Sequence, residues 1–137
     1  MAVKLYVDAG SDDEWGTLDS NWACGAVLEF PDGFIEAAKR LPKGTVNEAE
    51  YRGMIFGLEL AKRFGAKKLL VMADSQLVIR QITGRYQCRK EHLKPLLAQV
   101  KRLAREFEQI EWRWIPREQN ARADLLGRRV LPVLAGH

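Results

Sequence analysis

Four acidic residues stand where elements of secondary structure are expected to begin or end. Asp8 and Asp74 each close a short run typical of a strand, and Glu50 and Asp124 fall in the first turns of expected helices. Reactive groups in open α/β sheets gather at the carboxyl ends of parallel strands, so these four side chains can meet at one edge of a sheet. Each acid alone also has an ordinary structural explanation, such as a turn aspartate or a partner of a helix dipole.

The chemistry of such a group follows from its charge. Carboxylates packed closely repel one another, and a protein keeps them together only with cations. Because no His or Cys accompanies them, the ligand set favours hard ions, Mg²⁺ or Mn²⁺. Two such ions can activate water and stabilise a leaving oxygen, which is the chemistry of phosphodiester hydrolysis.

Composition limits the class of protein. The 137 residues, 47% hydrophobic and 29% charged, predict one domain with one core. There is no apolar run of membrane-spanning length, and the strand pattern close to Met1 leaves no room for a signal peptide, so we expect a cytoplasmic monomer without membrane contact. Reduced Cys24 and Cys88 are expected there, although a disulfide stays open. The net charge of +4 permits nucleic-acid binding.

Alternation and turn signals predict three strands in the first third of the chain. They cover Val3–Asp8, which ends at the acid, then Trp22–Phe30 and Phe34–Leu41. Residues 31–33 form a turn of the kind that joins a hairpin. Three strands in succession predict an antiparallel meander.

The stretch Thr45–Tyr51 predicts the start of a long, buried helix. Asn47 is expected to be its N-cap, and Glu50 three residues later completes a capping box. Glu48 is then an exposed residue of the first turn. A face bearing Gly53, Gly57 and Ala61 suits close packing against a sheet.

The second half of the chain predicts a parallel addition to the sheet. The apolar run Leu69–Ala73 reads as a strand buried on both faces, and a helix crosses over before it. The expected order is βββαβααβα, and its remaining parts are a helix through Ile82, an amphipathic helix from about Leu93, a strand over Ile110–Ile115, a last helix capped by Asn120, and a loose tail over Val130–His137. Trp112 and Trp114 share a strand face and are expected to pack in the core.

Four short segments together resemble the type 1 ribonuclease H family, over about residues 3 to 129. They are Tyr6–Ser11, Asn47–Tyr51, Asp74–Gln76 and Asn120–Leu126. The resemblance implies an α/β fold with a mixed five-stranded sheet and helices on both faces, in a single catalytic domain over residues 1–137. It also implies metal-dependent cleavage of the RNA strand of RNA/DNA hybrids, leaving 5′-phosphate and 3′-hydroxyl ends. Double-stranded RNA is a second candidate substrate.

The resemblance also implies roles for individual residues. Metal binding and catalysis are carried onto Asp8, Glu50, Asp74 and Asp124, and the family spacing selects Glu50 over Glu48. Substrate contacts are carried onto a further set: Thr45, Asn47, Ser75 and Gln76. Within that set Asn47 and Gln76 match amides that reach the minor groove, where the 2′-hydroxyl distinguishes RNA from DNA. Thr45 matches a position that touches a DNA phosphate, whereas the next family position is usually Asn and here is Val46. Many members place a His in the loop before the last acid, and here that loop offers Arg117, which is expected either to help product release or bind phosphate, or to be a surface residue.

Two other interpretations remain open. A catalytically silent module of the same fold could bind nucleic acid, although a binder gains nothing from clustered negative charge beside phosphates. A different α/β hydrolase, such as a phosphatase with Asp8 or Asp74 as nucleophile, would need a Lys and Ser/Thr pattern that is not found. The loop with Asp12, Asp13, Glu14 and Asp19 is predicted either to repel the hybrid backbone or to point into solvent without effect.

Overall fold

One mixed sheet forms the centre of the protein in the computed structural model, which describes residues 2–13 and 16–131. Its strands are β1 (Val3–Ser11), β2 (Trp22–Phe30), β3 (Gly33–Leu41), β4 (Lys68–Ala73) and β5 (Gln109–Trp114), in the spatial order β3-β2-β1-β4-β5. The first three pair antiparallel, and β4 and β5 join them in parallel. The expected meander and parallel addition are confirmed. Most of the predicted tail over Val130–His137 lies outside the described residues.

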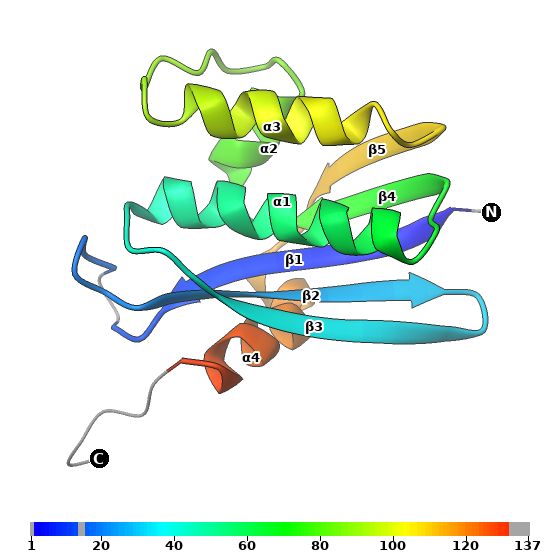
Figure 1. Cartoon of the computed structure of the whole chain (residues 1–137), viewed down its shortest axis with the longest axis horizontal. Coiled ribbons are helices and arrows are strands. Elements are labelled where there is room, and N and C mark those ends of the chain that lie inside the picture. Colours follow the sequence, from blue (N-terminus) through cyan, green and yellow to red (C-terminus); the bar gives the residue numbers. More distant parts are fainter. Residues whose placement is uncertain (1, 14–15, 132–137) are drawn as a thin grey trace.

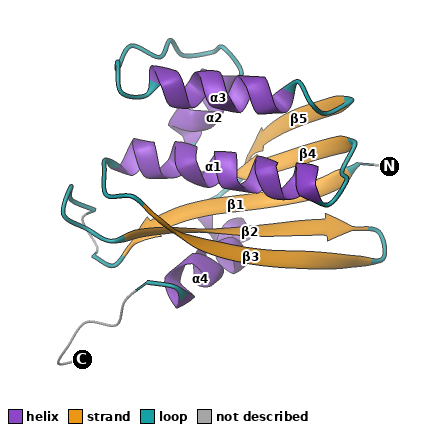
Figure 2. Cartoon of the chain, in the orientation of Figure 1, coloured by secondary structure: helices purple, strands orange, loops and turns teal. Residues whose placement is uncertain are grey.

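Helices cover both faces of this sheet, as expected (Figure 1; Figure 2). The elements are α1 (Val46–Arg63), α2 (Gln76–Ile82), α3 (Lys94–Ala104), the 3₁₀ turn η1 (Arg117–Asn120) and α4 (Ala121–Arg129). α1 packs on β1 and β2, with α2 and α3 beside it, while α4 packs on the opposite face of the same two strands. No helix in the described part of the chain is long and apolar enough to cross a membrane.

The first strand runs further than the sequence predicts. Asp8 was expected to end it, but β1 continues to Ser11. The two neighbours of β1 explain the difference, because the parallel ladder with β4 stops at the pair Val7–Ala73, whereas the antiparallel ladder with β2 continues to Ser11–Trp22. Asp8 is therefore the first residue beyond the parallel ladder, with its backbone still held by β2.

The start of α1 also differs from the prediction. Thr45, not Asn47, is the N-cap, and its hydroxyl accepts a hydrogen bond of 3.1 Å from the Glu48 amide. The Glu48 carboxylate accepts one of 2.8 Å from the Thr45 amide, which completes a capping box. Glu48 is thus an 18% exposed structural residue that also lies 3.7 Å from the Arg52 guanidinium, and not a solvated one. Glu50 is left without a capping role.

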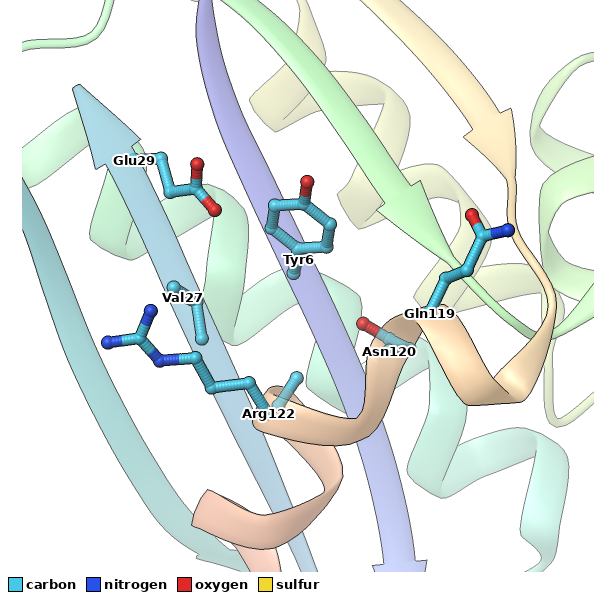
Figure 3. A pocket seen from close by; sticks show the side chains of 7 residues that line it. Tyr6, Val27, Glu29, Gln119, Asn120 and Arg122 are labelled. Atoms are coloured by element: carbon cyan, nitrogen blue, oxygen red, sulfur yellow. The ribbon is translucent and has the colours of Figure 1, made fainter. Parts of the chain in front are cut away.

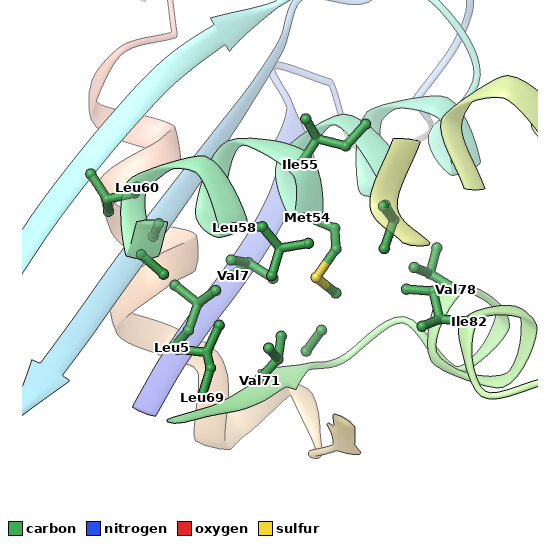
Figure 4. Close-up of a cluster of buried hydrophobic side chains, with 14 of the residues drawn as sticks. Leu5, Val7, Met54, Ile55, Leu58, Leu60, Leu69, Val71, Val78 and Ile82 are labelled. Atoms are coloured by element: carbon green, nitrogen blue, oxygen red, sulfur yellow. The ribbon is translucent and has the colours of Figure 1, made fainter. Parts of the chain in front are cut away.

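Glycine lets α1 lie close to the sheet, as the sequence predicts. A Cβ added to Gly57 would fall 2.3 Å from a methyl group of Val7, which is too close for any side chain. The face next to the sheet buries Met54, Leu58 and Ala61. Figure 4 shows this core, in which side chains of α1 meet those of β1, β4 and α2. The core therefore fixes the start of α1 relative to the ends of β1 and β4.

The two tryptophans of β5 have different surroundings. Trp112 packs partly buried against the core, as expected. Trp114 does not, since it is 42% exposed on the edge strand of the sheet. Its indole N–H donates a hydrogen bond of 3.1 Å to the backbone carbonyl of Asp74. The prediction of core packing is therefore wrong for Trp114.

Candidate functional site

Three carboxylates from three elements meet at the carboxyl end of the parallel strands. Asp8 leaves β1 just after the parallel ladder, Asp74 follows the last residue of β4, and Glu50 lies in the second turn of α1. One oxygen from each lies within 4.8 Å of the others. An all-oxygen set at this spacing can hold a hard divalent cation. We call these residues the acid triad.

Asp124 lies beside the acid triad but outside it. α4 approaches β2 so closely that a Cβ on Gly25 would fall 2.0 Å from the Ala123 carbonyl oxygen. This approach places Asp124 within hydrogen-bonding reach of Asp8. The other side of its carboxylate pairs with Arg128, whose Nε lies 3.0 Å from Oδ2. The structure thus groups three of the four predicted acids and sets the fourth at their border.

Burial and the charges of neighbouring carboxylates favour protons on Asp8 and Glu50. Asp8 is 7% exposed, and burial first, then the charges of Glu50 and Asp74, raise its pKa to about 9. Burial and Asp74 raise the pKa of Glu50 to about 8, while the nearby Arg117 guanidinium acts in the opposite direction. A site that disfavours negative charge to this degree is one in which bound cations are strongly stabilising.

Asn120 supports the triad in a way that the sequence does not predict. It was expected to cap the last helix, but its side chain makes no cap hydrogen bond and is 1% exposed. Its Nδ2 donates to the Val7 carbonyl at 2.7 Å and to Asp74 Oδ2 at 2.9 Å. Asn is a common N-cap residue, so its type and position gave no signal for this buried role.

An open pocket of about 180 Å³, lined in part by Asn120, lies between the sheet and the start of α4. Figure 3 looks into it, with Tyr6, Glu29 and Asn120 among its lining side chains. Asn120 Oδ1 is buried and has no hydrogen-bond partner within residues 2–13 and 16–131. The amide is therefore anchored by its nitrogen alone.

Comparison with known proteins agrees with this geometry. A family model described as "Reverse transcriptase-like" matches residues 15–130. The crystal structure of RNase H1 from the archaeon Halobacterium salinarum superimposes with a TM-score of 0.85 at 30% identity, covering 94% of this chain and 96% of that one. The chain belongs to the ribonuclease H family.

Two other relatives support the assignment. The "Bifunctional protein Rv2228c" of Mycobacterium tuberculosis is 37% identical over 98% of this chain, which spans only 37% of that protein's length. The structure of its N-terminal RNase H domain matches with a TM-score of 0.84 at 34% identity, covering 95% of this chain and 93% of that one. LC11-RNase H1, solved in complex with an RNA/DNA hybrid, matches with a TM-score of 0.84 at 27% identity, covering 94% and 96%.

The residues expected to touch substrate lie at the starts of two helices and in the 3₁₀ turn η1. Thr45 and Asn47 lie at the start of α1, and Ser75 and Gln76 at the start of α2. Like Thr45, Ser75 is a helix cap, since its hydroxyl accepts a hydrogen bond of 3.3 Å from the Val78 amide. Arg117 lies in η1 and lines a cleft of about 450 Å³ together with Glu50 and Asp124.

The acids of the first loop have structural roles in this cleft. Asp12 accepts hydrogen bonds from the Asn21 backbone at 3.0 Å and side chain at 2.6 Å. Asp13 accepts from the Gly16 amide at 2.9 Å and the Ser20 hydroxyl at 2.8 Å. Asp12 and Asp13 also line the cleft, so they do not simply point into solvent. Whether they repel the hybrid backbone stays a prediction. Glu14 lies outside the described residues.

Proposed function

We propose that this protein is a metal-dependent endonuclease that hydrolyses the RNA strand of RNA/DNA hybrids, with 5′-phosphate and 3′-hydroxyl products. The observation that carries the proposal is the acid triad, in which Asp8, Glu50 and Asp74 converge within 4.8 Å in a chain of the ribonuclease H family. A domain that only bound nucleic acid would gain nothing from three carboxylates placed where phosphates must approach.

The donor set fits Mg²⁺, with Mn²⁺ as the alternative. Its ligands are carboxylate oxygens without nitrogen or sulfur, and its charges repel unless cations neutralise them. Asp8, Glu50 and Asp74 would hold the ions, and Asp124 would complete the set from α4. Divalent cations there would activate water for attack on phosphorus and neutralise charge on the leaving 3′ oxygen.

The chain's own side chains orient these ligands. Asn120 restrains Asp74 directly and Asp8 through the Val7 carbonyl, so both carboxylates are positioned before any ion binds. Arg128 orients Asp124 through their ion pair. Arg117 adds positive charge next to Glu50, where a phosphate of the cleaved strand would pass.

Residues at the helix starts would recognise the hybrid. Asn47 and Gln76 offer amides for the minor groove, and the half-buried or exposed position of each leaves it accessible. The hydroxyls of Thr45 and Ser75 each accept the hydrogen bond that caps their helix. Each hydroxyl still has a proton that it can donate to a phosphate oxygen. We expect these four side chains to act in binding and not in the chemical step.

A cleavage assay tests the proposal. The protein is incubated with a labelled RNA/DNA hybrid, double-stranded RNA and double-stranded DNA, each with Mg²⁺, Mn²⁺ or EDTA. We expect cleavage of the hybrid's RNA strand with either ion and none in EDTA, and product ends that a 5′-phosphate-dependent exonuclease accepts. Binding without cleavage under every metal condition would identify a silent module instead, and 2′,3′-cyclic phosphate ends would contradict hydrolysis by water.

A further inference from the structure

A second groove lies at the edge of the sheet, on the other side of Asp74 from the acidic cleft. α2 and the edge strand β5 enclose it, and its volume is about 360 Å³ (Figure 1 shows the two elements). Of the residues that line it, Gln76 at the start of α2 also belongs to the proposed substrate contacts. We call it the α2–β5 groove.

The α2–β5 groove is strongly basic. Arg80, Arg85 and Arg113 line it, and guanidinium groups keep their charge at any physiological pH. No carboxylate lines it among the residues that the structure describes, and Arg85 and Arg113 form no ion pair there. The acidic cleft on the other side of the triad contains Asp12, Asp13, Glu50 and Asp124 against two arginines, Arg117 and Arg128. The α2–β5 groove, with arginines and no carboxylate among its lining residues, therefore attracts an anion more strongly than the acidic cleft does.

The same groove presents an aromatic surface. Trp114 lines it and is 42% exposed, and its hydrogen bond to the Asp74 carbonyl fixes the direction of the ring. Tyr86 is not a lining residue, but it is 45% exposed and lies under the guanidinium of the lining residue Arg80, at 5.1 Å from ring centroid to Cζ. Exposed aromatic rings beside guanidinium groups are the features that bind unpaired nucleotides, through stacking of bases and contacts to phosphates.

The position of the groove indicates which strand would enter it. Trp114 contacts the backbone of Asp74 itself, and Gln76 is two residues further along the chain. A strand whose phosphodiester lies at the acid triad is therefore adjacent to the mouth of the groove. Bases inside a duplex stack on one another and leave no face for Trp114, whereas the bases of a single strand are free to stack.

We propose that the α2–β5 groove binds a single-stranded extension of the RNA strand, next to the hybrid segment that is cut. This rests on the proposed function, because it assumes that the RNA strand lies at the triad. The protein would then prefer hybrids at the border between paired and unpaired RNA.

Kinetics on matched substrates test the inference. Four hybrids share one duplex and differ only in their ends: blunt, with a 5′ or a 3′ RNA extension, or with a DNA extension. We expect KM for one of the RNA-extended hybrids to be at least about fivefold below that of the blunt hybrid, as a single stacked base would give. kcat should change little, since the extension does not touch the triad.

Three variants and one control locate the effect. Arg113→Gln should remove most of the KM difference between the RNA-extended and the blunt hybrid. It should also reduce the slope of log KM against log salt by about 0.7, the value for one phosphate contact on a single strand. Trp114→Leu should remove the KM difference as well, whereas Trp114→Phe keeps an aromatic face and should retain most of it. Arg63→Gln removes the same charge from the far end of α1 and should behave as wild type.

The outcomes separate this inference from the proposed function. Equal KM values for blunt and extended hybrids, or an advantage that survives in Arg113→Gln and Trp114→Leu, would overturn it while cleavage of the hybrid stands. If no hybrid is cleaved, fluorescence anisotropy of the same four labelled duplexes in EDTA still tests the groove. Tighter binding of the RNA-extended duplex by wild type than by Arg113→Gln would then support the groove without the nuclease.

Discussion

Asn120 connects the backbone of one strand to the side chain that follows another. One amide group reaches Val7, which precedes Asp8, and also the carboxylate of Asp74. Asn120 lies at the junction of η1 and α4. Its hydrogen bonds therefore couple the position of the last helix to the position of the acid triad. The sequence offers four acids as candidates, but this side chain decides how accurately two of them are placed.

Replacement of Asn120 should therefore affect both stability and catalysis. Asn120→Ala leaves the buried Val7 carbonyl without its partner and should lower the free energy of unfolding by about 2 kcal/mol. Loss of orientation at Asp74 should lower kcat on a hybrid by about tenfold or more. Gln119→Ala, at the exposed neighbouring position, is the control. Equal kcat in the two variants, measured together with thermal unfolding, would show that Asn120 has no positioning role.

The raised pKa values of Asp8 and Glu50 predict how stability depends on pH. In the folded, metal-free protein the pKa of Asp8 is about 9 and that of Glu50 about 8, whereas an unfolded chain has ordinary carboxyl values near 4. Between these limits the folded state binds more protons than the unfolded state. The stability contributed by these two groups therefore falls as pH rises from about 4 to about 9.

Thermal unfolding in EDTA at a series of pH values tests this expectation. Glu50→Gln cannot ionise at that position, so its Tm should fall less steeply with pH than that of the wild type. Mg²⁺ should raise the wild-type Tm more at pH 8 than at pH 6, because ligand binding requires the deprotonated carboxylates. Parallel pH curves for the two proteins would contradict the burial of Glu50 beside Asp74.

At the scale of elements, most of the architecture could be predicted from pattern. Alternation predicts β2 at its observed bounds, and the apolar run before Asp74 predicts β4 to within one residue. Local pattern did not predict the length of β1, since its end depends on which neighbour continues to pair. It also did not decide between Thr45 and Asn47 as caps, because each has a Glu three residues later.

The candidate site, too, has features that the sequence predicts and features that it does not. The sequence predicts all three triad acids, since Asp74 directly follows β4, Asp8 lies close to the expected end of β1, and Glu50 lies near the start of α1. The ion pair of Asp124 with Arg128 was also available in the sequence as an i,i+4 pair. The contacts of Asn120 and Trp114 with Asp74 could not be predicted, because both join residues about forty positions apart. Such contacts depend on the crossing of elements and leave no local pattern.

The packing of α4 on β2 gives a prediction at this scale. In Gly25→Ala the new Cβ would lie 2.0 Å from the Ala123 carbonyl oxygen and 2.9 Å from the Gly127 amide nitrogen, both backbone atoms. α4 must shift, so Asp124 moves away from Asp8. We expect a loss of about 1 to 3 kcal/mol in unfolding free energy and a marked loss of cleavage.

Gly33→Ala is the matched control for that variant. A Cβ there has no atom within 4 Å, and Gly33 is not among the glycines with positive φ. Its stability and activity should match the wild type. If Gly25→Ala also keeps full activity, then the close approach of α4 is not needed to place Asp124.

In the molecule as a whole, the two cysteines report on different parts of the fold. Both are free thiols, which decides the question of a disulfide that the sequence left open. Cys24 is fully buried near the start of β2, and burial raises its pKa to about 12, while Cys88 is partly exposed in the connector before α3. A thiol reagent should therefore modify Cys88 within seconds to minutes, and Cys24 only when the sheet opens.

Pulse labelling followed by mass spectrometry measures both rates. The Cys88→Ser variant isolates Cys24, and its labelling rate should rise with denaturant in parallel with global unfolding. Similar labelling rates for the two thiols in the native protein would contradict the burial of β2 under α1 and α4.

The charge of the molecule is divided around the triad. A cleft with several carboxylates lies on one side and a groove with three arginines on the other, within a net charge of +4. Cations and phosphodiesters would thus be drawn to adjoining surfaces. The central claim is that the carboxylates of the triad act together as one metal site for cleavage, and that Glu48, two residues before Glu50, has only a structural part.

Single-turnover cleavage of a hybrid at saturating Mg²⁺ by Asp74→Asn and Glu48→Gln tests that claim most directly. Asp74→Asn removes a metal ligand and should reduce the rate at least about a hundredfold. It should leave the fold intact, because it relieves repulsion within the triad. Gln can still complete the capping box in Glu48→Gln, which should therefore cleave at nearly the wild-type rate. A near-normal rate for Asp74→Asn, or an inactive but folded Glu48→Gln, would contradict the account.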